Sequence, residues 1–184
     1  MDNIECAKRK IKETIAASKV PEDPGHAINT LAWLLKLDPK SDPAMQIAAL
    51  AHDIDRAVEL RKVRRSDYDD YDIFKAAHAQ NGAKILREIL DDCQVAKDIA
   101  DEACRLVTLH EVGGDSRSDL LKDVDSISYF DVNMPLYFQR EGWDETKRRC
   151  IWGHQRLSSQ GKEIVKGITY ENPVLTKLLN EAIG

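Results

Sequence analysis

The stretch PAMQIAALAHDIDR, residues 43–56, decides the expected fold. Its first nine residues are almost wholly apolar, which is typical of a helix at the buried centre of a bundle. Asp42 is a good N-cap and the proline after it suits the first helical position, so we expect a helix over about 43–54. His52 and Asp53 follow the apolar run at once. Buried ionisable groups are costly unless something compensates for them, and a metal cation would compensate both.

Helical periodicity recurs on both sides of this stretch, and we expect an all-α protein. Apolar residues repeat every three or four positions between segments rich in glycine, proline or charge. The other expected helices cover about residues 4–15, 26–37, 72–90, 95–110, 120–130, 141–158 and 173–183. Segment 56–71 is charged and lacks a clean period, which indicates a mostly exposed loop with room for a short helix. No internal repeat or linker is found, so we expect one compact helical bundle over residues 1–184.

Composition and charge exclude several classes of protein. The formal net charge of -5 argues against a dominant nucleic-acid-binding surface, which would need a basic domain. The polar N-terminus does not predict a signal peptide, and no run of about 18 apolar residues occurs, so we expect a cytoplasmic protein without a membrane partner. The four cysteines are scattered and form no C-x-x-C pair, which predicts reduced thiols. Monomer and homodimer both stay open.

Further ionisable residues lie on the apolar sides of other predicted helices. They are His26, His78, His110 and Asp125. A single histidine on an apolar face is more often a hydrogen-bonded core residue than a metal ligand. With His52 and Asp53, however, the set places six candidate ligands on five helices. Imidazoles and carboxylates without thiolates suit Fe, Mn, Co or Zn better than a structural cysteine-zinc site.

The order of these residues resembles the HD superfamily, a group of metal-dependent phosphohydrolases and related proteins named for its His-Asp doublet. The resemblance is carried by ALAHDIDR at 49–56, HAQNGA at 78–83, LHE at 109–111 and LKDVDS at 121–126. It implies an HD-type bundle whose core covers about 26–130, with an N-terminal helix and a C-terminal helical extension. The additional His78 and His110 resemble the branch of the superfamily that has six ligands and two metals.

The resemblance implies two metal ions that share Asp53 as a bridging ligand. The other implied ligands are His26, His52 and Asp125 on one ion and His78 and His110 on the other. Fe or Mn would be the first choice of cofactor, and Co, Ni, Zn and Mg are alternatives; a single ion also stays open. Asp123 competes with Asp125 for the ligand role. We prefer Asp125 because it lies one turn from Leu121 and from Tyr129, on the apolar side of its helix.

The implied activity is that of a metal-dependent phosphohydrolase, which would act on a nucleotide or another small phosphoester through a metal-activated water. His52, Asp53 and Arg56 are the candidate catalytic residues. The candidate phosphate anchors are Arg56, Arg61, Lys62, Arg64 and Arg65, because guanidinium groups grip phosphate through paired hydrogen bonds. Asp55 either pairs with one of these arginines or assists proton transfer, and the sequence leaves this choice open.

Other functions stay open as well. An HD-type di-iron oxygenase could use the same six ligands, and a regulatory HD module could keep the fold without turnover. The Gly-Tyr-Pro signature of cyclic-di-GMP phosphodiesterases is missing, and so is the extended His-Asp-x-x-Glu-Asp pattern of stringent-response hydrolases, so we do not expect those substrates. A second basic cluster near Trp143 and Trp152 either closes over the substrate or faces water on an amphipathic helix. Its members are Lys147, Arg148, Arg149, His154 and Arg156, and His154 is not expected to be a ligand.

Overall fold

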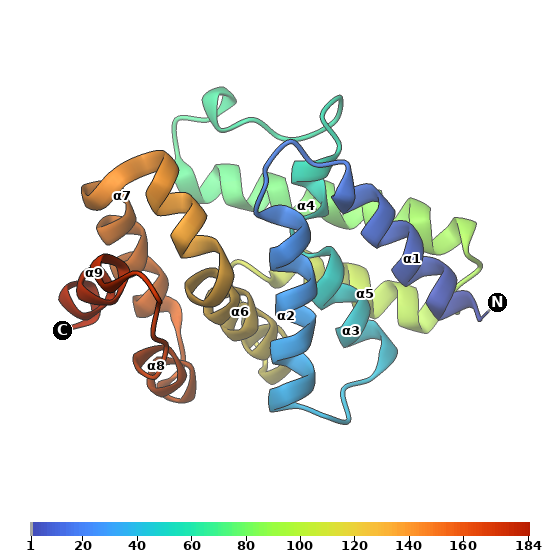
Figure 1. The fold of residues 1–184 in the computed structure, drawn as a ribbon. Coiled ribbons are helices and arrows are strands. Elements are labelled where there is room, and N and C mark those ends of the chain that lie inside the picture. Colours follow the sequence, from blue (N-terminus) through green and yellow to red (C-terminus); the bar gives the residue numbers. More distant parts are fainter. Residues whose placement is uncertain (1) are drawn as a thin grey trace.

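Every regular element of residues 2–184 is helical in a computed structural model of the protein (Figure 1). The all-α prediction is therefore confirmed. The α-helices are α1 (Asn3–Ala16), α2 (Asp23–Leu37), α3 (Pro43–Ala51), α4 (Tyr71–Asp92), α5 (Lys97–Leu109), α6 (Ser116–Ser128), α7 (Met134–Arg156), α8 (Ser159–Lys166) and α9 (Pro173–Ile183). Short 3-10 helices, η1 (Ile54–Ala57) and η2 (Arg65–Asp67), follow α3, and a π-helical turn, η3 (Tyr129–Asn133), joins α6 to α7.

Helix α3 is the buried centre of the bundle. Seven of its nine residues are buried, and it contacts α1, α2, α5 and α6. The carboxylate of Asp42 accepts a hydrogen bond from the backbone N–H of Met45 at 3.0 Å and caps the helix. The last turn of α3 therefore brings the residues that follow it into the interior of the protein.

Two hydrophobic clusters hold the helices together. The first is built from α1 to α5 and the first part of α6, and the second from the end of α6 together with η3, α7, α8 and α9. Trp33 and Leu37 of α2 pack against both clusters. Figure 1 shows α7, α8 and α9 on the side of α2 and α6 that faces away from α1. Helices α2 and α6 thus join the two halves of the molecule.

Two helix boundaries differ from the prediction near the candidate ligands. Helix α2 begins at Asp23, earlier than expected, because Pro24 lies in its first turn, where a missing N–H costs no hydrogen bond. Helix α3 ends at Ala51, earlier than expected, and η1 follows it. His26 therefore lies inside a helix, whereas Asp53 lies in a turn.

The C-terminal part differs more. Pro135 does not break the chain but lies in the first turn of α7, which follows η3 directly. Gly142 has a φ of 78°, which glycine adopts without steric cost, and α7 bends sharply there (Figure 1). Helix α8 was not predicted, whereas α9 has the expected bounds.

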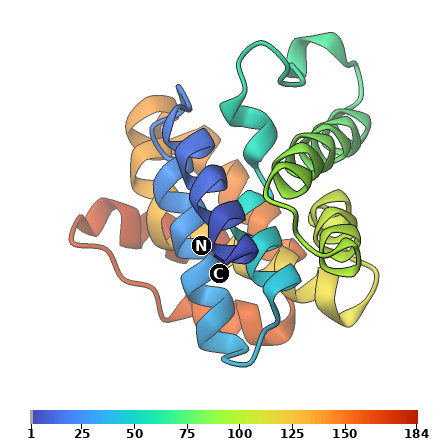
Figure 2. The ribbon, with the colours of Figure 1, turned by 90° about the vertical axis from the view of Figure 1, so that its right-hand side faces the viewer.

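The segment between η1 and α4 arches away from the helices in both views (Figures 1 and 2), as expected for an exposed loop, and carries η2.

The prediction of reduced thiols is wrong for two cysteines: Cys6 of α1 and Cys93, which follows α4, form a disulfide, while Cys104 and Cys150 are free. The two bonded cysteines are 87 residues apart in the sequence, and the fold brings them together. At this separation the spacing of cysteines does not predict a disulfide. Among the described residues, no helix combines the length and the apolar character that crossing a bilayer requires.

Candidate metal centre

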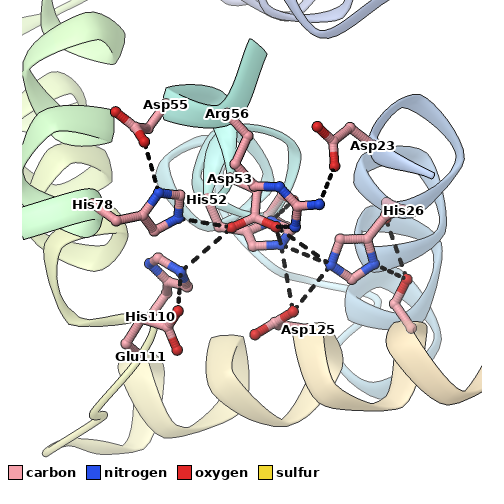
Figure 3. Close-up of polar contacts among 12 residues, drawn as sticks. Asp23, His26, His52, Asp53, Asp55, Arg56, His78, His110, Glu111 and Asp125 are labelled. Carbon is pink, nitrogen blue, oxygen red and sulfur yellow. Dashed lines mark hydrogen bonds and ion pairs between the residues drawn. The ribbon is translucent and has the colours of Figure 1, made fainter. Parts of the chain in front are cut away.

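The six candidate ligands come together at one place inside the bundle (Figure 3). Helices α2, α4 and α6 each contribute one of them from within the helix, whereas α3 and α5 contribute residues that directly follow their last turns. They are His26, His52, Asp53, His78, His110 and Asp125. The four histidines are buried, and the two aspartate side chains are 15–17% exposed toward a cavity.

The ligand atoms form two triads, in each of which they lie within 4.8 Å of one another. The first triad is His26, His52 and Asp125, and the second triad is Asp53, His78 and His110. In the first, the Nε2 atom of His26 lies 3.1 Å from Nε2 of His52 and 3.1 Å from Oδ1 of Asp125. In the second, Oδ1 of Asp53 lies 3.0 Å from Nε2 of His78 and 3.9 Å from Nε2 of His110.

The Asp53 carboxylate faces both triads. Its Oδ1 belongs to the second triad, while its Oδ2 lies 4.0 Å from Nε2 of His26 and 3.9 Å from Nε2 of His52. A carboxylate placed in this way can give one oxygen to each of two neighbouring cations. The Asp53 carboxylate therefore lies between the two triads, with one oxygen toward each.

Each histidine is oriented by a hydrogen bond from its outer ring nitrogen. Nδ1 of His52 lies 3.0 Å from the carbonyl oxygen of Ala49, and Nδ1 of His110 lies 2.7 Å from that of Val107. A carbonyl oxygen only accepts, so both Nδ1 atoms carry the proton and the Nε2 lone pairs point into the centre. This is the tautomer that metal-binding histidines need.

The other two histidines have the same orientation. Nδ1 of His26 lies 2.9 Å from the hydroxyl of Ser128, which donates its own proton to the carbonyl oxygen of His26 and therefore accepts from the ring. Nδ1 of His78 lies 2.8 Å from a carboxylate oxygen of Asp55. The Nε2 atoms of all four rings are thus turned toward the triads.

This donor set fits metal cations. The facing Nε2 atoms of His26 and His52 need either a proton or a cation between them, and the buried Nε2 of His110 has no hydrogen-bond partner. Without a cation, burial lowers the pKa of His52, but Asp53 and Asp125 outweigh burial and raise that pKa to about 9. The residues present could hold divalent transition-metal ions through nitrogen and oxygen atoms, with no thiolate in either triad.

Asp55 orients the second triad. It is buried, and besides His78 it accepts hydrogen bonds from the side-chain amide of Asn81 and from the backbone N–H of Val63. The sequence left open whether Asp55 pairs with an arginine or assists proton transfer. In the structure its partner is instead the imidazole of His78, which it holds from behind, and it ties the exposed loop to α4.

Arg56 lies between two carboxylates at the edge of the centre. One guanidinium nitrogen lies 2.8 Å from Oδ2 of Asp53, and another lies 2.8 Å from Oδ1 of Asp23. Burial raises the pKa of Asp53, but Arg56 and His52 outweigh it and hold that pKa well below its usual range. The sequence did not predict a role for Asp23, because this residue precedes the expected start of α2 and is not part of an apolar helical pattern.

The choice of Asp125 over Asp123 agrees with the geometry, because Asp125 belongs to the first triad and Asp123 belongs to neither triad. Asp123 is not on a polar face but buried, and its carboxylate accepts hydrogen bonds from the backbone N–H and the hydroxyl of Ser158 at the start of α8. Asp123 therefore anchors α8, an element that the sequence did not predict.

A cavity of about 490 Å³ opens above both triads. Four of the five predicted phosphate anchors line it, namely Arg56, Lys62, Arg64 and Arg65. Arg61 does not; its guanidinium makes two hydrogen bonds, of 2.6 and 2.8 Å, with the carboxylate of Glu88 on the exposed side of α4. The prediction is therefore wrong for Arg61.

A family model described as a domain of unknown function, DUF4202, matches residues 4–178. The chain belongs to this family. No curated protein and no solved structure gives a significant match. The function of this DUF4202 chain must therefore be argued from the arrangement of its own side chains.

Further residues of the DUF4202 site were missed by the sequence analysis. Glu111 places one carboxylate oxygen 3.5 Å from Nε2 of His110, and its other oxygen lies 3.0 Å from the guanidinium of Arg156 and in contact with the ammonium of Lys75. Burial lowers the pKa of Lys75 to about 8, although Glu111 opposes this effect. Glu111 could have been found from its position next to His110, and Lys75 from its position one turn before His78.

The second basic cluster divides between the cavity and the solvent. Arg149 and Arg156 line the cavity, whereas Lys147 and Arg148 form ion pairs with Glu181 and Glu145. His154 belongs to neither triad, as expected. Part of this cluster thus lines the cavity and part faces water, because α7 turns one side toward the cavity and the other toward solvent.

Proposed function

We propose that this DUF4202 protein is a metal-dependent phosphohydrolase of the HD superfamily that acts on a small phosphoester. The observation that carries the proposal is Asp53, whose two oxygens face two separate His/Asp triads at the floor of a cavity lined by cationic side chains. Two neighbouring divalent cations are a common arrangement for hydrolysis of phosphoesters, and the two triads would hold one each. The cationic walls favour a negatively charged substrate.

Bound divalent cations would supply a water molecule of lowered pKa and would polarise a phosphoryl oxygen. Arg56 donates one N–H to Asp53 and forms an ion pair with Asp23, so it keeps donors for a phosphoryl oxygen while holding Asp53 in place. Asp55 keeps the ring of His78 oriented. Arg156 and Lys75 together neutralise Glu111 and keep its carboxylate at the cavity wall.

The proposal is tested by metal content and by turnover of phosphoesters. Protein purified without chelators and without an affinity-metal step would be assayed with Mn²⁺ or Fe²⁺ on p-nitrophenyl phosphate, bis(p-nitrophenyl) phosphate and nucleotides. We expect release of phosphate or nitrophenol at the same rate with and without dioxygen. His52→Ala and Asp53→Ala should lose metal and lower turnover by about a hundredfold or more, because each removes a ligand.

His154→Ala is the matched control, because it removes an imidazole that lies outside both triads. It should keep metal content and turnover. Normal metal content in His52→Ala and Asp53→Ala would contradict the metal centre. Turnover that stops without dioxygen would replace hydrolysis by the oxygenase chemistry that the same ligands permit.

A further inference from the structure

The cations that line the cavity divide into two groups according to their partners. Those near the triads are paired with carboxylates: Arg56 with Asp53 and Asp23, and Lys75 and Arg156 with Glu111. Lys62 and Arg140 are also paired, with Glu59 and Glu22. These pairs neutralise part of the charge around the floor of the cavity.

The remaining arginines of the cavity wall have no such partner. Arg64, Arg65 and Arg149 line the cavity, and no carboxylate of residues 2–184 lies within ion-pair distance of any of them. Unpaired guanidinium groups that face a cavity are suited to bind a ligand anion, because they need not first give up an ion pair.

Arg65 and Arg149 approach the same aromatic wall from different elements. The guanidinium carbon of Arg65 lies 5.7 Å from the ring centre of Tyr71, and that of Arg149 lies 4.4 Å from the ring centre of Trp152. The rings of Tyr71 and Trp152 meet edge to face with their centres 6.3 Å apart. One arginine comes from η2 and the other from α7, and the paired cations Lys75 and Arg156 also lie over the Trp152 ring. We call the part of the cavity wall at Arg65 and Arg149 the arginine end.

The ring of Phe74 lies between the second triad and Arg65. Its ring is stacked on the imidazole of His78, with the centres 6.3 Å apart, and its centre lies 6.0 Å from the guanidinium carbon of Arg65. One aromatic ring thus lies between the imidazole of His78 in the second triad and the guanidinium of Arg65. A single phosphate group at the metal centre would not reach across this ring, but a longer molecule would.

We propose that the cavity binds molecules with an anionic group at each end. One anion is the phosphoester at the two triads, and the other, a phosphate or a carboxylate, lies between Arg65 and Arg149. The part between them contacts the rings of Tyr71 and Phe74, which line the cavity. This inference rests on the proposed function for the first anion only; the second anion site stands on the unpaired arginines.

The test compares two probes that resist hydrolysis, hexane-1,6-diphosphonic acid and hexylphosphonic acid. They share the same six-carbon chain and differ only in the second anion. Their affinity for the Mn²⁺-loaded and the metal-free protein would be measured by titration calorimetry without dioxygen. We expect the diphosphonate to bind the metal-loaded protein at least about tenfold more tightly than the monophosphonate, since the second phosphonate gains charge-assisted hydrogen bonds.

The chain offers a matched control for each arginine. Arg65→Ala and Arg149→Ala should abolish the preference for the diphosphonate and leave the monophosphonate affinity within about twofold. Arg61→Ala and Arg148→Ala remove arginines of the same segments whose partners, Glu88 and Glu145, lie outside the cavity wall, and they should keep the preference.

The outcomes separate this inference from the proposed function. Equal affinity for the two probes, or the same loss in Arg148→Ala as in Arg149→Ala, overturns the second anion site and leaves the metal centre standing. A second outcome is that Mn²⁺ does not bind, while the metal-free protein still prefers the diphosphonate and Arg149→Ala removes that preference. This outcome overturns the proposed function and leaves the second anion site standing. Absence of this preference in both states overturns the inference.

Discussion

At the scale of single residues, the four imidazoles of the centre are fixed before any metal arrives. Their Nδ1 atoms donate to two carbonyl oxygens, a hydroxyl and a carboxylate, and the acceptors belong to the same bundle that holds the rings. Such outer partners fix the tautomer and lower the entropy cost of binding. Only Asp55 is charged among these acceptors, so His78 is the ligand whose orientation is most sensitive to a change in its partner.

We expect Asp55→Asn to weaken metal binding at the second triad by about 10- to 100-fold, a loss typical of changes to the outer partners of ligands. The amide cannot accept from His78, Asn81 and Val63 together, so one donor loses its partner. Titration with Mn²⁺ should show one weakened site and one unchanged site. Asp101→Asn, an exposed carboxylate of α5, is the control. Equal affinities in both variants would show that Asp55 does not position His78.

Metal affinity should rise with pH. Without metal, burial lowers the pKa of His78, but Asp53 and Asp55 outweigh burial and raise it to about 10, while that of His52 is about 9. Below these values both rings hold protons that a cation must displace, so binding weakens as pH falls and levels off above about pH 10. Each displaced proton changes the affinity by about tenfold per pH unit. Calorimetry in buffers of different ionisation enthalpy counts these protons; a pH-independent affinity would contradict the prediction.

The residues that the sequence could reveal are those with a pattern around them. His26, His52, His78, His110 and Asp125 follow or interrupt apolar helical stripes, and the structure brings all of them together with Asp53. Asp23, Lys75 and Glu111 were missed because their roles depend on partners from other helices. Arg61 was assigned to the cavity because it lies in a basic run, but Glu88 of α4 holds it on the outer surface.

At the scale of elements, α1 is attached to the end of α4 by a covalent bond. Cys6 and Cys93 form a disulfide whose Cα atoms are 5.8 Å apart and whose sequence separation is 87 residues. Closing so long a segment restricts the unfolded chain strongly.

We expect Cys6→Ser to lower the free energy of unfolding by about 2–5 kcal/mol, because the unfolded chain regains the freedom that the disulfide removes. Urea denaturation with and without a reductant measures the effect. Cys104→Ser changes a free, half-buried thiol and is the control; it should keep the response to reductant, whereas Cys6→Ser should lose it. A wild-type stability that does not change with reductant would contradict the prediction.

Helix positions were predictable where periodicity and caps agree, as in α1, α9 and the start of α3. Helix positions were not predictable where a residue type occurs both at breaks and inside helices. Pro24 and Pro135 indicate breaks in a sequence, yet both lie in first helical turns. Gly142 bends α7 through a positive φ that only the packed structure reveals, and α8 depends on its contact with Asp123.

At the scale of the whole molecule, the helices of the two hydrophobic clusters supply different parts of the site. All six candidate ligands come from α2 to α6 and the residues that directly follow α3 and α5, whereas α7 supplies Arg149 and Arg156 to the cavity wall. Trp33 of α2 packs against both clusters and donates a 2.9 Å hydrogen bond to Asp131 of η3. The position of α7, and with it the arginine end of the cavity, is therefore tied to the helix that carries His26.

Because the ligands come from five different helices, metal binding should stabilise the whole fold. At a free Mn²⁺ concentration about 100 times the dissociation constant, the native state gains about 2.7 kcal/mol, provided that the unfolded chain binds no metal. For a chain of this size the midpoint of thermal unfolding should rise by roughly 5–10 °C. His52→Ala should lose this rise, and His154→Ala should keep it, since its imidazole belongs to neither triad. An unfolding midpoint that stays the same with Mn²⁺ and with a chelator would mean that the triads do not hold a cation in the native state.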